Sequence, residues 1–323
     1  MKFGTIIAVF AAMLAVASGP AGAQDWPQKP VRIVVPFGPG GTSDTLGRIV
    51  ALELSRKFGQ QFVVENRPGG GGTVGSAEVA REDPDGYTLV VSGVGSHVVA
   101  PAINPNVRFD PVADFTHIAM LGGPPAVLVA HPSLGVKSLP ELVTLLKSGG
   151  DPVSYASPGA GTHGHLIAEY FKGKAGVEME HIPYRGAGTS IADLIAGHVQ
   201  VGSFTLSSAA AQIRAGALVG IAVSSAQRLP QFPEVPTFAE QGYPDLVATT
   251  WFALSGPKGM PPAIVDPLNA AVVEIMRSPE VTKRLELDAI QVEPLKPAEV
   301  TAFFQSEIAR WTPVAKASGA QPE

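Results

Sequence analysis

The chain has 323 residues, of which 36 are glycine and 30 are proline, and 45% of its residues are hydrophobic while only 16% are charged. This balance excludes a disordered or low-complexity chain, and the length predicts one large or two medium domains. The formal net charge of -5 argues against a broad nucleic-acid-binding or anionic-membrane surface. Because the chain has no cysteine, disulfides, thiolate metal sites, cysteine nucleophiles and a lipid anchor on an N-terminal cysteine are excluded.

The N-terminal segment has the pattern of a secretory signal. Lys2 is followed by an apolar run from Thr5 to Ala17, and Ala21-Gly22-Ala23 supplies the small residues that a signal peptidase requires. The run is shorter than the roughly 20 residues of a membrane-spanning helix. We therefore predict a signal peptide over residues 1–23, cleavage before Gln24, and an exported protein without a lipid anchor.

Strands and helices alternate through the first part of the mature chain. The β-branched residues 31–35 predict a strand, a glycine loop follows over 36–44, and apolar residues then recur at helical spacing as far as Gly59. The same order repeats in a strand over 61–65, a glycine loop and short helix over 67–81, and a strand over 87–92. Such alternation predicts parallel strands with helices on both faces of the sheet.

A second alternating series begins near Ala126. Strands are expected over 126–130, 153–156, 178–183, 199–204 and 219–223, with helices over 139–147, 163–171 and 190–196. Beyond Gly256 the pattern is mostly helical, and this short tail has too little core to fold alone. We therefore expect it to return to the first series through crossings near 123–126 and 246–254.

The predicted fold class is α/β with two lobes, each a mostly parallel sheet flanked by helices. The first lobe is predicted to contain residues 24–125 and 250–323, and the second residues 126–249. Two lobes joined by paired crossing segments can hinge about them, and closure around a ligand is a recognised use of that geometry. The sequence therefore predicts a ligand cleft between the lobes.

Two glycine loops are placed to bind anions. Pro36 to Asp44 and Ser157 to His163 each lie between a predicted strand and the first turn of a helix, where backbone N–H groups lack partners and favour negative charge. In open α/β sheets the ligand crevice lies at these strand ends. Either loop alone reads as a tight turn, but the matched pair favours an anion site. Because neither loop contains Lys or Arg, Arg185 and Arg67 are the nearest basic candidates. Gly41 is expected at the ligand, with a backbone dihedral that favours glycine.

Other motifs point less clearly to a chemistry. Gly159, Gly161 and Gly164 match the dinucleotide fingerprint, but three spaced glycines are weak evidence in a glycine-rich exported chain, and the phosphate-loop pattern is absent. Neither a Gly-x-Ser-x-Gly elbow nor a His-Glu-x-x-His motif occurs. A secreted hydrolase or lyase that uses His163 or His97 as a base stays an alternative, as does a periplasmic ligand sensor that docks to a signalling partner.

An ordered set of motifs resembles one family. The set comprises Trp26-Pro27-x-Lys29-Pro30-Val31, Pro36-Phe37-x-Pro39-Gly40-Gly41-Thr42-x-Asp44, Glu65-Asn66-Arg67-Pro68-Gly69, Asp83-Pro84-Asp85-Gly86-Tyr87 and Pro183-Tyr184-Arg185-Gly186. It resembles the Bug family of periplasmic solute-binding receptors, the extracytoplasmic components of tripartite tricarboxylate transporters. The resemblance implies a periplasmic-binding-protein-like clamp that holds a carboxylated metabolite between its lobes and delivers it to membrane permease subunits.

The resemblance also implies a set of ligand-binding residues. The loop from Phe37 to Asp44 would hold a carboxylate through backbone N–H groups, and the loop from Ser157 to Thr162 would hold the ligand from the other lobe. The chain departs from the family near Phe204, where members often carry an acidic residue. For Asp193 the sequence is equally consistent with a residue that braces the cleft and with a solvated helix residue. The predicted ligand-binding residues are Phe37, Gly40, Gly41, Thr42, Asp44, Ser92, Ser96, Ser157, Gly161, Thr162, His163, Tyr184, Asp193 and Phe204.

From these patterns we expect a monomeric receptor that is not an enzyme. Its ligand would be a small organic acid, a di- or tricarboxylate, an acidic amino acid or an aromatic acid. No cofactor, metal or nucleic acid is expected in its site.

Overall fold

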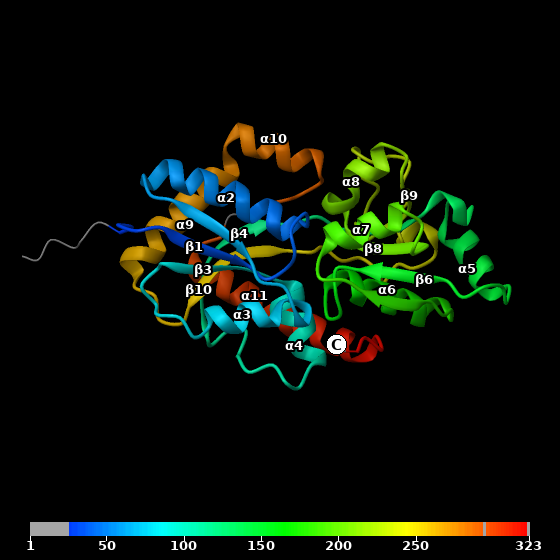
Figure 1. Ribbon diagram of the computed structural model, residues 1–323, viewed down its shortest axis with the longest axis horizontal. Helices are drawn as coiled ribbons and strands as arrows, with labels where there is room; N and C mark the ends of the chain where they lie inside the picture. Colours follow the sequence, from blue (N-terminus) through cyan, green and yellow to red (C-terminus); the bar gives the residue numbers. More distant parts are fainter. Residues whose placement is uncertain (1–25, 293–294, 322–323) are drawn as a thin grey trace, which may run out of the picture.

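A computed structural model describes residues 26–292 and 295–321, so the predicted signal peptide lies outside the described residues. Two five-stranded sheets lie side by side along the long axis of the molecule, with helices packed around each (Figure 1). The strand order is β2-β1-β3-β10-β4 in the first sheet and β7-β6-β8-β5-β9 in the second. The two-lobed α/β architecture is thereby confirmed. No helix within the described ranges has the length and apolar character needed to span a membrane.

The first lobe is built on the first sheet. Its strands are β1 (Val31–Val35), β2 (Phe62–Asn66), β3 (Thr88–Gly93), β4 (Phe115–Gly122) and β10 (Phe252–Pro257). Its helices are α2 (Thr42–Phe58), α3 (Thr73–Val79), α4 (Ala100–Ile103), α9 (Pro262–Arg277), α10 (Pro279–Leu287) and α11 (Pro297–Ala317), with short helical turns η1 (Gly70–Gly72) and η2 (Gly95–Val99). Ile33 of β1, Leu46 of α2 and Leu268 of α9 share one fully buried core, so the C-terminal helices complete this lobe.

The second lobe is built on the second sheet. Its strands are β5 (Ala126–Ala130), β6 (Ser154–Ser157), β7 (Glu180–Pro183), β8 (Val201–Thr205) and β9 (Val219–Val223). Its helices are α5 (Leu139–Lys147), α6 (His163–Ala175), α7 (Ala187–Ile195) and α8 (Leu206–Arg214), with turns η3 (Pro132–Leu134) and η4 (Ala239–Gln241). The bounds of β5, β9 and α5 are those predicted, because their apolar runs are bounded by clear turn and cap residues, such as Ser138 at the start of α5.

Both sheets are mixed, but in each of them four strands share one direction and a single strand opposes them, so the prediction of mostly parallel sheets is confirmed. In the first sheet β1 is parallel to β2 and β3, whereas β10 is antiparallel to β3 and β4. In the second sheet β6 is parallel to β7 and β8, whereas β5 is antiparallel to β8 and β9. The reason is the path between the lobes. Strands β5 and β10 each start at the lobe boundary and run outward, while the strands of the βα units run toward it.

The segments that connect the lobes lie against one another. Residues 123–125 join β4 to β5, and the returning chain pairs with them: the Thr250 N–H donates to the Pro124 carbonyl oxygen at 2.9 Å, and Thr249 bridges to Pro125. A further bridge links Gly123 to Gln291. Helix α11 then runs beneath the second lobe and contacts α6 (Figure 1, red). The C-terminal helix therefore packs on both lobes.

Candidate ligand-binding cleft

The lobes meet along a seam of glycines. The Gly38 N–H donates to the Arg185 carbonyl oxygen at 2.9 Å across the boundary. A Cβ on Gly38 would overlap that oxygen, and a Cβ on Gly186 would lie 2.9 Å from the Gly38 Cα. The other glycines whose Cβ would meet the opposite lobe within 3.4 Å are Gly40, Gly71, Gly161 and Gly188. We call Gly38, Gly40, Gly71, Gly161, Gly186 and Gly188 the glycine seam. At the seam the two backbones approach more closely than side chains allow.

A cavity of about 50 Å³ lies between the lobes, beside the seam. The first lobe contributes Phe37, Gly41, Thr42, Ser43, Val94, Gly95 and Phe252, the second contributes Pro158, Thr162, His163, Gly164, Ala187, Thr205 and Ser208, and the connecting segment contributes Thr250. Among these described lining residues none is Asp, Glu, Lys or Arg. The walls therefore combine apolar surface with hydroxyl groups and backbone, and carry no fixed side-chain charge.

The first turns of helices from both lobes open onto this cavity. Thr42 and Ser43 begin α2, His163 and Gly164 begin α6, Ala187 begins α7, and Ser208 lies in the first turn of α8. Each helix follows a strand that ends at the cleft, so its N-terminus must start there. First-turn N–H groups have no intrahelical partner, and the helix dipole adds positive potential. The cavity is thus suited to an anion held without a cationic side chain.

Hydroxyl groups connect the first turns of α2 and α8 across the boundary. The Thr42 Oγ1 lies 2.6 Å from the Thr205 Oγ1 and within hydrogen-bond distance of the Ser207 and Ser208 hydroxyls. The Thr42 N–H donates to the Ser208 Oγ at 3.2 Å, and Thr205 and Ser208 are 2.7 Å apart. Because α2 and α8 belong to different lobes, this hydroxyl cluster joins the two lobes.

His163 is the one titratable side chain among the described residues that line the cavity. Its Nδ1 lies 2.6 Å from the Thr250 Oγ1, its ring meets Trp311 edge-on at 6.1 Å, and its buried Nε2 has no hydrogen-bond partner in the described part of the chain. Burial, followed by the nearby charge of Arg310, lowers the pKa of His163 to about 4. The ring is therefore neutral at neutral pH, where it offers a hydrogen bond but no charge.

Asp44 braces the first loop from outside the cavity. Its carboxylate accepts from the Gly40 N–H at 3.1 Å and the Asn66 Nδ2 at 3.0 Å, and it pairs with Arg48 at 2.9 Å. Burial opposes ionisation, but the hydrogen bonds from Arg48 and Asn66 outweigh it and lower the Asp44 pKa. Asn66 also donates to the Phe37 carbonyl oxygen at 2.9 Å. The loop is thus held by β2 before any ligand arrives.

A stack of histidines supports the second loop. The Ser157 Oγ lies 2.7 Å from the His181 Nε2, and the Gly161 N–H donates to the His165 Nδ1 at 3.0 Å. The His165 and His181 rings stack with centroids 4.0 Å apart. Thr162 donates to the Gly159 carbonyl oxygen at 2.7 Å and caps α6. These contacts fix the loop at the start of α6.

The structure separates the predicted residues into groups. Phe37, Gly41, Thr42, Thr162 and His163 line the cavity. Gly40 and Gly161 belong to the glycine seam, and Asp44 and Ser157 brace the loops. Tyr184 and Asp193 lie apart from the cavity and bond to each other at 2.8 Å.

Three further predicted residues lie outside the cavity lining. The Ser92 hydroxyl donates to the Ala253 carbonyl oxygen within the first sheet. Ser96 contacts the Nδ1 of buried His97 at 2.9 Å. Phe204 belongs to the core of the second lobe. Successive side chains of a strand alternate between faces, so the neighbouring Thr205 reaches the cavity where Phe204 does not.

Several lining residues were missed by sequence reasoning. Thr205 and Ser208 flank the start of α8, a helix that was not predicted, although a strand followed by hydroxyl residues and alanines is a usable helix-start pattern. Thr250, Phe252 and Val94 carry no local pattern that marks a site. They reach the cavity only through the path of the connecting segment and the pairing of the lobes.

Gly41 lines the cavity, but the expectation that its backbone dihedral favours glycine is wrong. Its φ is −92° and its ψ 170°, an extended conformation that any residue adopts, and a Cβ there would make an ordinary 3.5 Å contact with the Ala187 Cβ. The residue that precedes a helix is normally extended, which explains the difference. Within this loop the positive φ belongs to Gly40, at 84°, and the steric requirement to Gly38.

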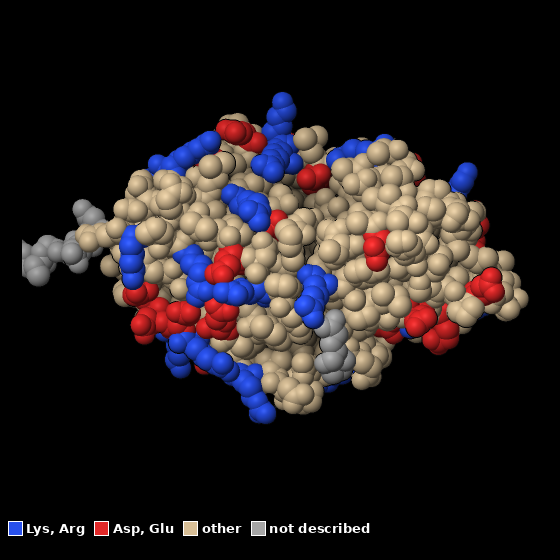
Figure 2. All heavy atoms as spheres, in the orientation of Figure 1, with Lys and Arg blue, Asp and Glu red and all other residues tan. Residues whose placement is uncertain are grey.

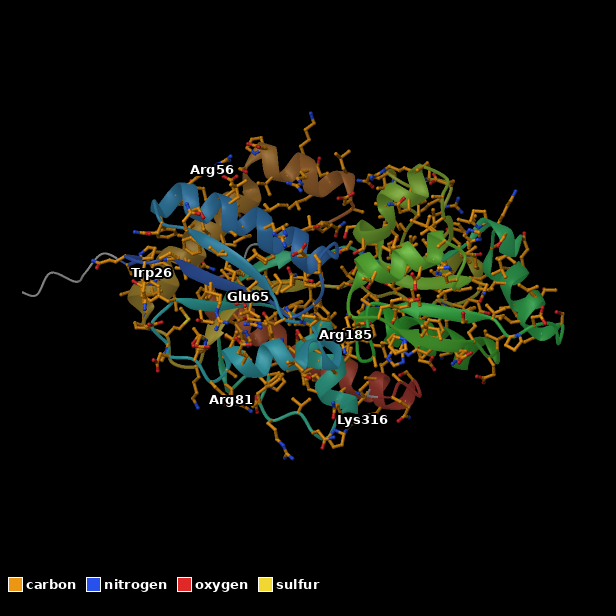
Figure 3. All side chains as sticks on the ribbon, viewed as in Figure 1. Trp26, Arg56, Glu65, Arg81, Arg185 and Lys316 are labelled. Atoms are coloured by element: carbon orange, nitrogen blue, oxygen red, sulfur yellow. The ribbon has the colours of Figure 1, made fainter. Side chains whose placement is uncertain are left out.

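The basic side chains lie outside the cavity. Arg67 pairs with Glu65 at 2.6 Å, within a network that also contains Arg32 and Glu78. In Figure 2 charged side chains crowd this face of the first lobe more than the second. Figure 3 places Arg185 at the junction of the lobes, where its side chain is exposed and only its carbonyl oxygen reaches Gly38.

Arg185→Ala is therefore expected to change carboxylate affinity by less than about fivefold, because an exposed charge contributes only about 0–1 kcal/mol. Titration calorimetry of the wild type and the variant measures the change. A loss of tenfold or more would show that the guanidinium itself binds the ligand.

The comparisons with known proteins agree with this geometry. Residues 46–320 match the family model described as the tripartite tricarboxylate transporter family receptor. The chain is 34% identical over 317 residues to Protein BugT of Bordetella pertussis, covering 98% of this chain and 97% of that protein. Two solved structures from Rhodopseudomonas palustris are also similar. Rpa4515 with adipate has a TM-score of 0.87 and 34% identity, over 92% of this chain and 99% of that one.

MatC (Rpa3494) with bound malate has a TM-score of 0.85 and 31% identity, over 90% of this chain and 100% of that one. The motif resemblance noted in the sequence is thus confirmed over nearly the whole chain. The chain belongs to the tripartite tricarboxylate transporter receptor family, whose members are solute-binding receptors.

Proposed function

We propose that this protein is an extracytoplasmic receptor that binds a small carboxylate between its lobes and releases it to the permease subunits of a tripartite tricarboxylate transporter. The observation that carries the proposal is the cavity itself. First turns of α2, α6, α7 and α8 surround it, and no charged side chain stands among its described lining residues. Backbone N–H groups with positive helix ends are a ready anion site. The adipate and malate bound by the similar proteins support a carboxylate.

The proposal includes the boundaries of the lobes and their motion. Residues 24–125 with 250–323 would form one rigid body and residues 126–249 the other, which the membership of the two sheets supports. The glycine seam and the hydroxyl cluster are contacts of the closed arrangement. Ligand entry then requires the connecting segments to act as a hinge. The protein would act as a monomer, exported after cleavage before Gln24.

The same geometry argues against the hydrolase or lyase alternative. His97 is fully buried among Phe115, Phe304 and His117, away from the cavity lining, and burial holds its pKa well below 6.5. A general base works best with a pKa near the operating pH, and His163, at about 4, is far from it. Neither histidine is therefore suited to proton abstraction at neutral pH.

A ligand screen tests the proposal. A carboxylate present at 100 times its dissociation constant should stabilise the mature chain by about 2.7 kcal/mol, which raises the midpoint of thermal unfolding measurably. Small-angle scattering of the same complex should show compaction relative to the free protein, and prolonged incubation should return the carboxylate unchanged. A panel of carboxylates that shifts no midpoint would overturn the receptor function, and formation of a product would favour the enzyme.

A further inference from the structure

We propose that the cavity selects carboxylic acids that carry no amino group and rejects the matching amino acids. This inference rests on the proposed carboxylate-receptor function and narrows it to one class of ligand.

No carboxylate is available to pair with a ligand ammonium. The described lining residues include neither Asp nor Glu. Asp44, the nearest acid in the first loop, is already engaged by Arg48, Asn66 and the Gly40 N–H. An ammonium enclosed without a counter-charge loses its hydration and gains no ion pair, which costs several kcal/mol.

The helix N-termini make an ammonium group in the cavity still less favourable. The first turns of α2, α6, α7 and α8 point their positive ends at the cavity. A carboxylate is stabilised at a helix N-terminus, whereas a cation is destabilised there by a comparable amount. One arrangement of dipoles therefore favours the acid group of a ligand and opposes its amino group.

Most of the hydroxyl groups in the wall are already paired. The hydroxyls of Thr42, Thr205 and Ser208 bond to one another, and the Thr162 hydroxyl bonds to the Gly159 carbonyl oxygen. The His163 Nε2 is a buried lining atom without a hydrogen-bond partner in the described part of the chain. An ammonium has three N–H donors, and this neutral ring could accept at most one of them. An uncharged hydrogen-bonding group of the ligand fits His163 better.

Matched pairs of ligands test the selection. The mature full-length chain is titrated calorimetrically at neutral pH with succinate against L-aspartate, glutarate against L-glutamate, and 3-methylbutanoate against L-valine. Each pair differs by one amino group. The acid without the amino group is expected to bind at least about a hundredfold more tightly in every pair that binds.

An amino acid that binds as tightly as its partner would overturn the selection while leaving the receptor function intact. If these six compounds and the wider carboxylate panel all fail to bind, the receptor function falls and this inference falls with it.

A variant provides a second test inside the cavity. Thr205→Asp places a carboxylate on the wall, and it is expected to narrow the preference for the acid by at least about tenfold in each binding pair. Thr205→Asn is the matched control, with the same shape and no charge, and should keep the wild-type preference. Circular dichroism and the unfolding midpoint verify that both variants fold. If Thr205→Asp folds and keeps the wild-type preference for the acid, the charge of this wall does not determine the selection. If Thr205→Asp does not fold, the selection is tested by the matched ligand pairs on the wild-type protein.

Discussion

Gly38→Ala is expected to hold the lobes apart and to weaken carboxylate binding by about thirtyfold or more. The new methyl group would overlap the Arg185 carbonyl oxygen and remove the hydrogen bond that this oxygen accepts from the Gly38 N–H. Loss of a buried hydrogen bond together with steric overlap costs about 2 kcal/mol or more, which is the stated factor. Gly38 does not have a positive φ, so its own loop tolerates alanine. The penalty therefore falls on closure and not on folding.

Gly173→Ala is the control for this prediction. It introduces the same methyl group at an exposed position of α6 outside the cavity lining, where nothing lies within 4 Å of the new Cβ. Calorimetry with the tightest carboxylate of the panel should show near-normal affinity for Gly173→Ala and a large loss for Gly38→Ala. Small-angle scattering should show that only Gly38→Ala stays extended at ligand saturation. Normal compaction of Gly38→Ala would mean that the seam does not govern closure.

The stability of the protein is expected to fall steeply as the pH drops from about 6.5 toward 4. Burial lowers the pKa of His117, His163 and His165 to about 4 and that of His181 to about 3, and holds the pKa of His97 well below 6.5. Between these values and 6.5 the unfolded chain binds protons that the folded chain does not. The free energy of unfolding therefore rises with pH across this window and levels off above it.

Each histidine that stays neutral in the folded state contributes a slope of up to about 1.4 kcal/mol per pH unit within the window. Guanidinium unfolding at several pH values between about 7.5 and 4.5 measures the summed slope of the free energy of unfolding against pH. His117→Asn removes one such group while keeping an acceptor near the Ser255 hydroxyl, which lies 2.9 Å from the His117 Nδ1, so its profile should be shallower. His198→Asn alters a side chain that is 71% exposed and should leave the slope unchanged. A profile that is flat between about pH 6.5 and 5 would mean that the buried rings are protonated in the folded protein.

The sequence by itself determined the local elements and the type of fold. The runs over 126–130 and 219–223 and the helix over 139–147 were predicted with their observed bounds, because apolar periodicity and capping residues are local properties. The two glycine loops followed from the same local logic, and they brought Phe37, Thr42 and His163 into the prediction.

Only the tertiary structure decided how those elements meet. Strands β4 and β10 were not predicted, and the direction of β5 and β10 depends on where the chain crosses between the lobes, which no local pattern encodes. Thr250 and Ser208 lie more than 150 residues beyond the first loop in the chain, and only the fold brings them to the same cavity. The need for glycine at position 38 arises from a carbonyl oxygen on the opposite lobe. Contacts of this kind join residues that are distant in the chain and meet only in the tertiary structure, and sequence periodicity therefore cannot predict them.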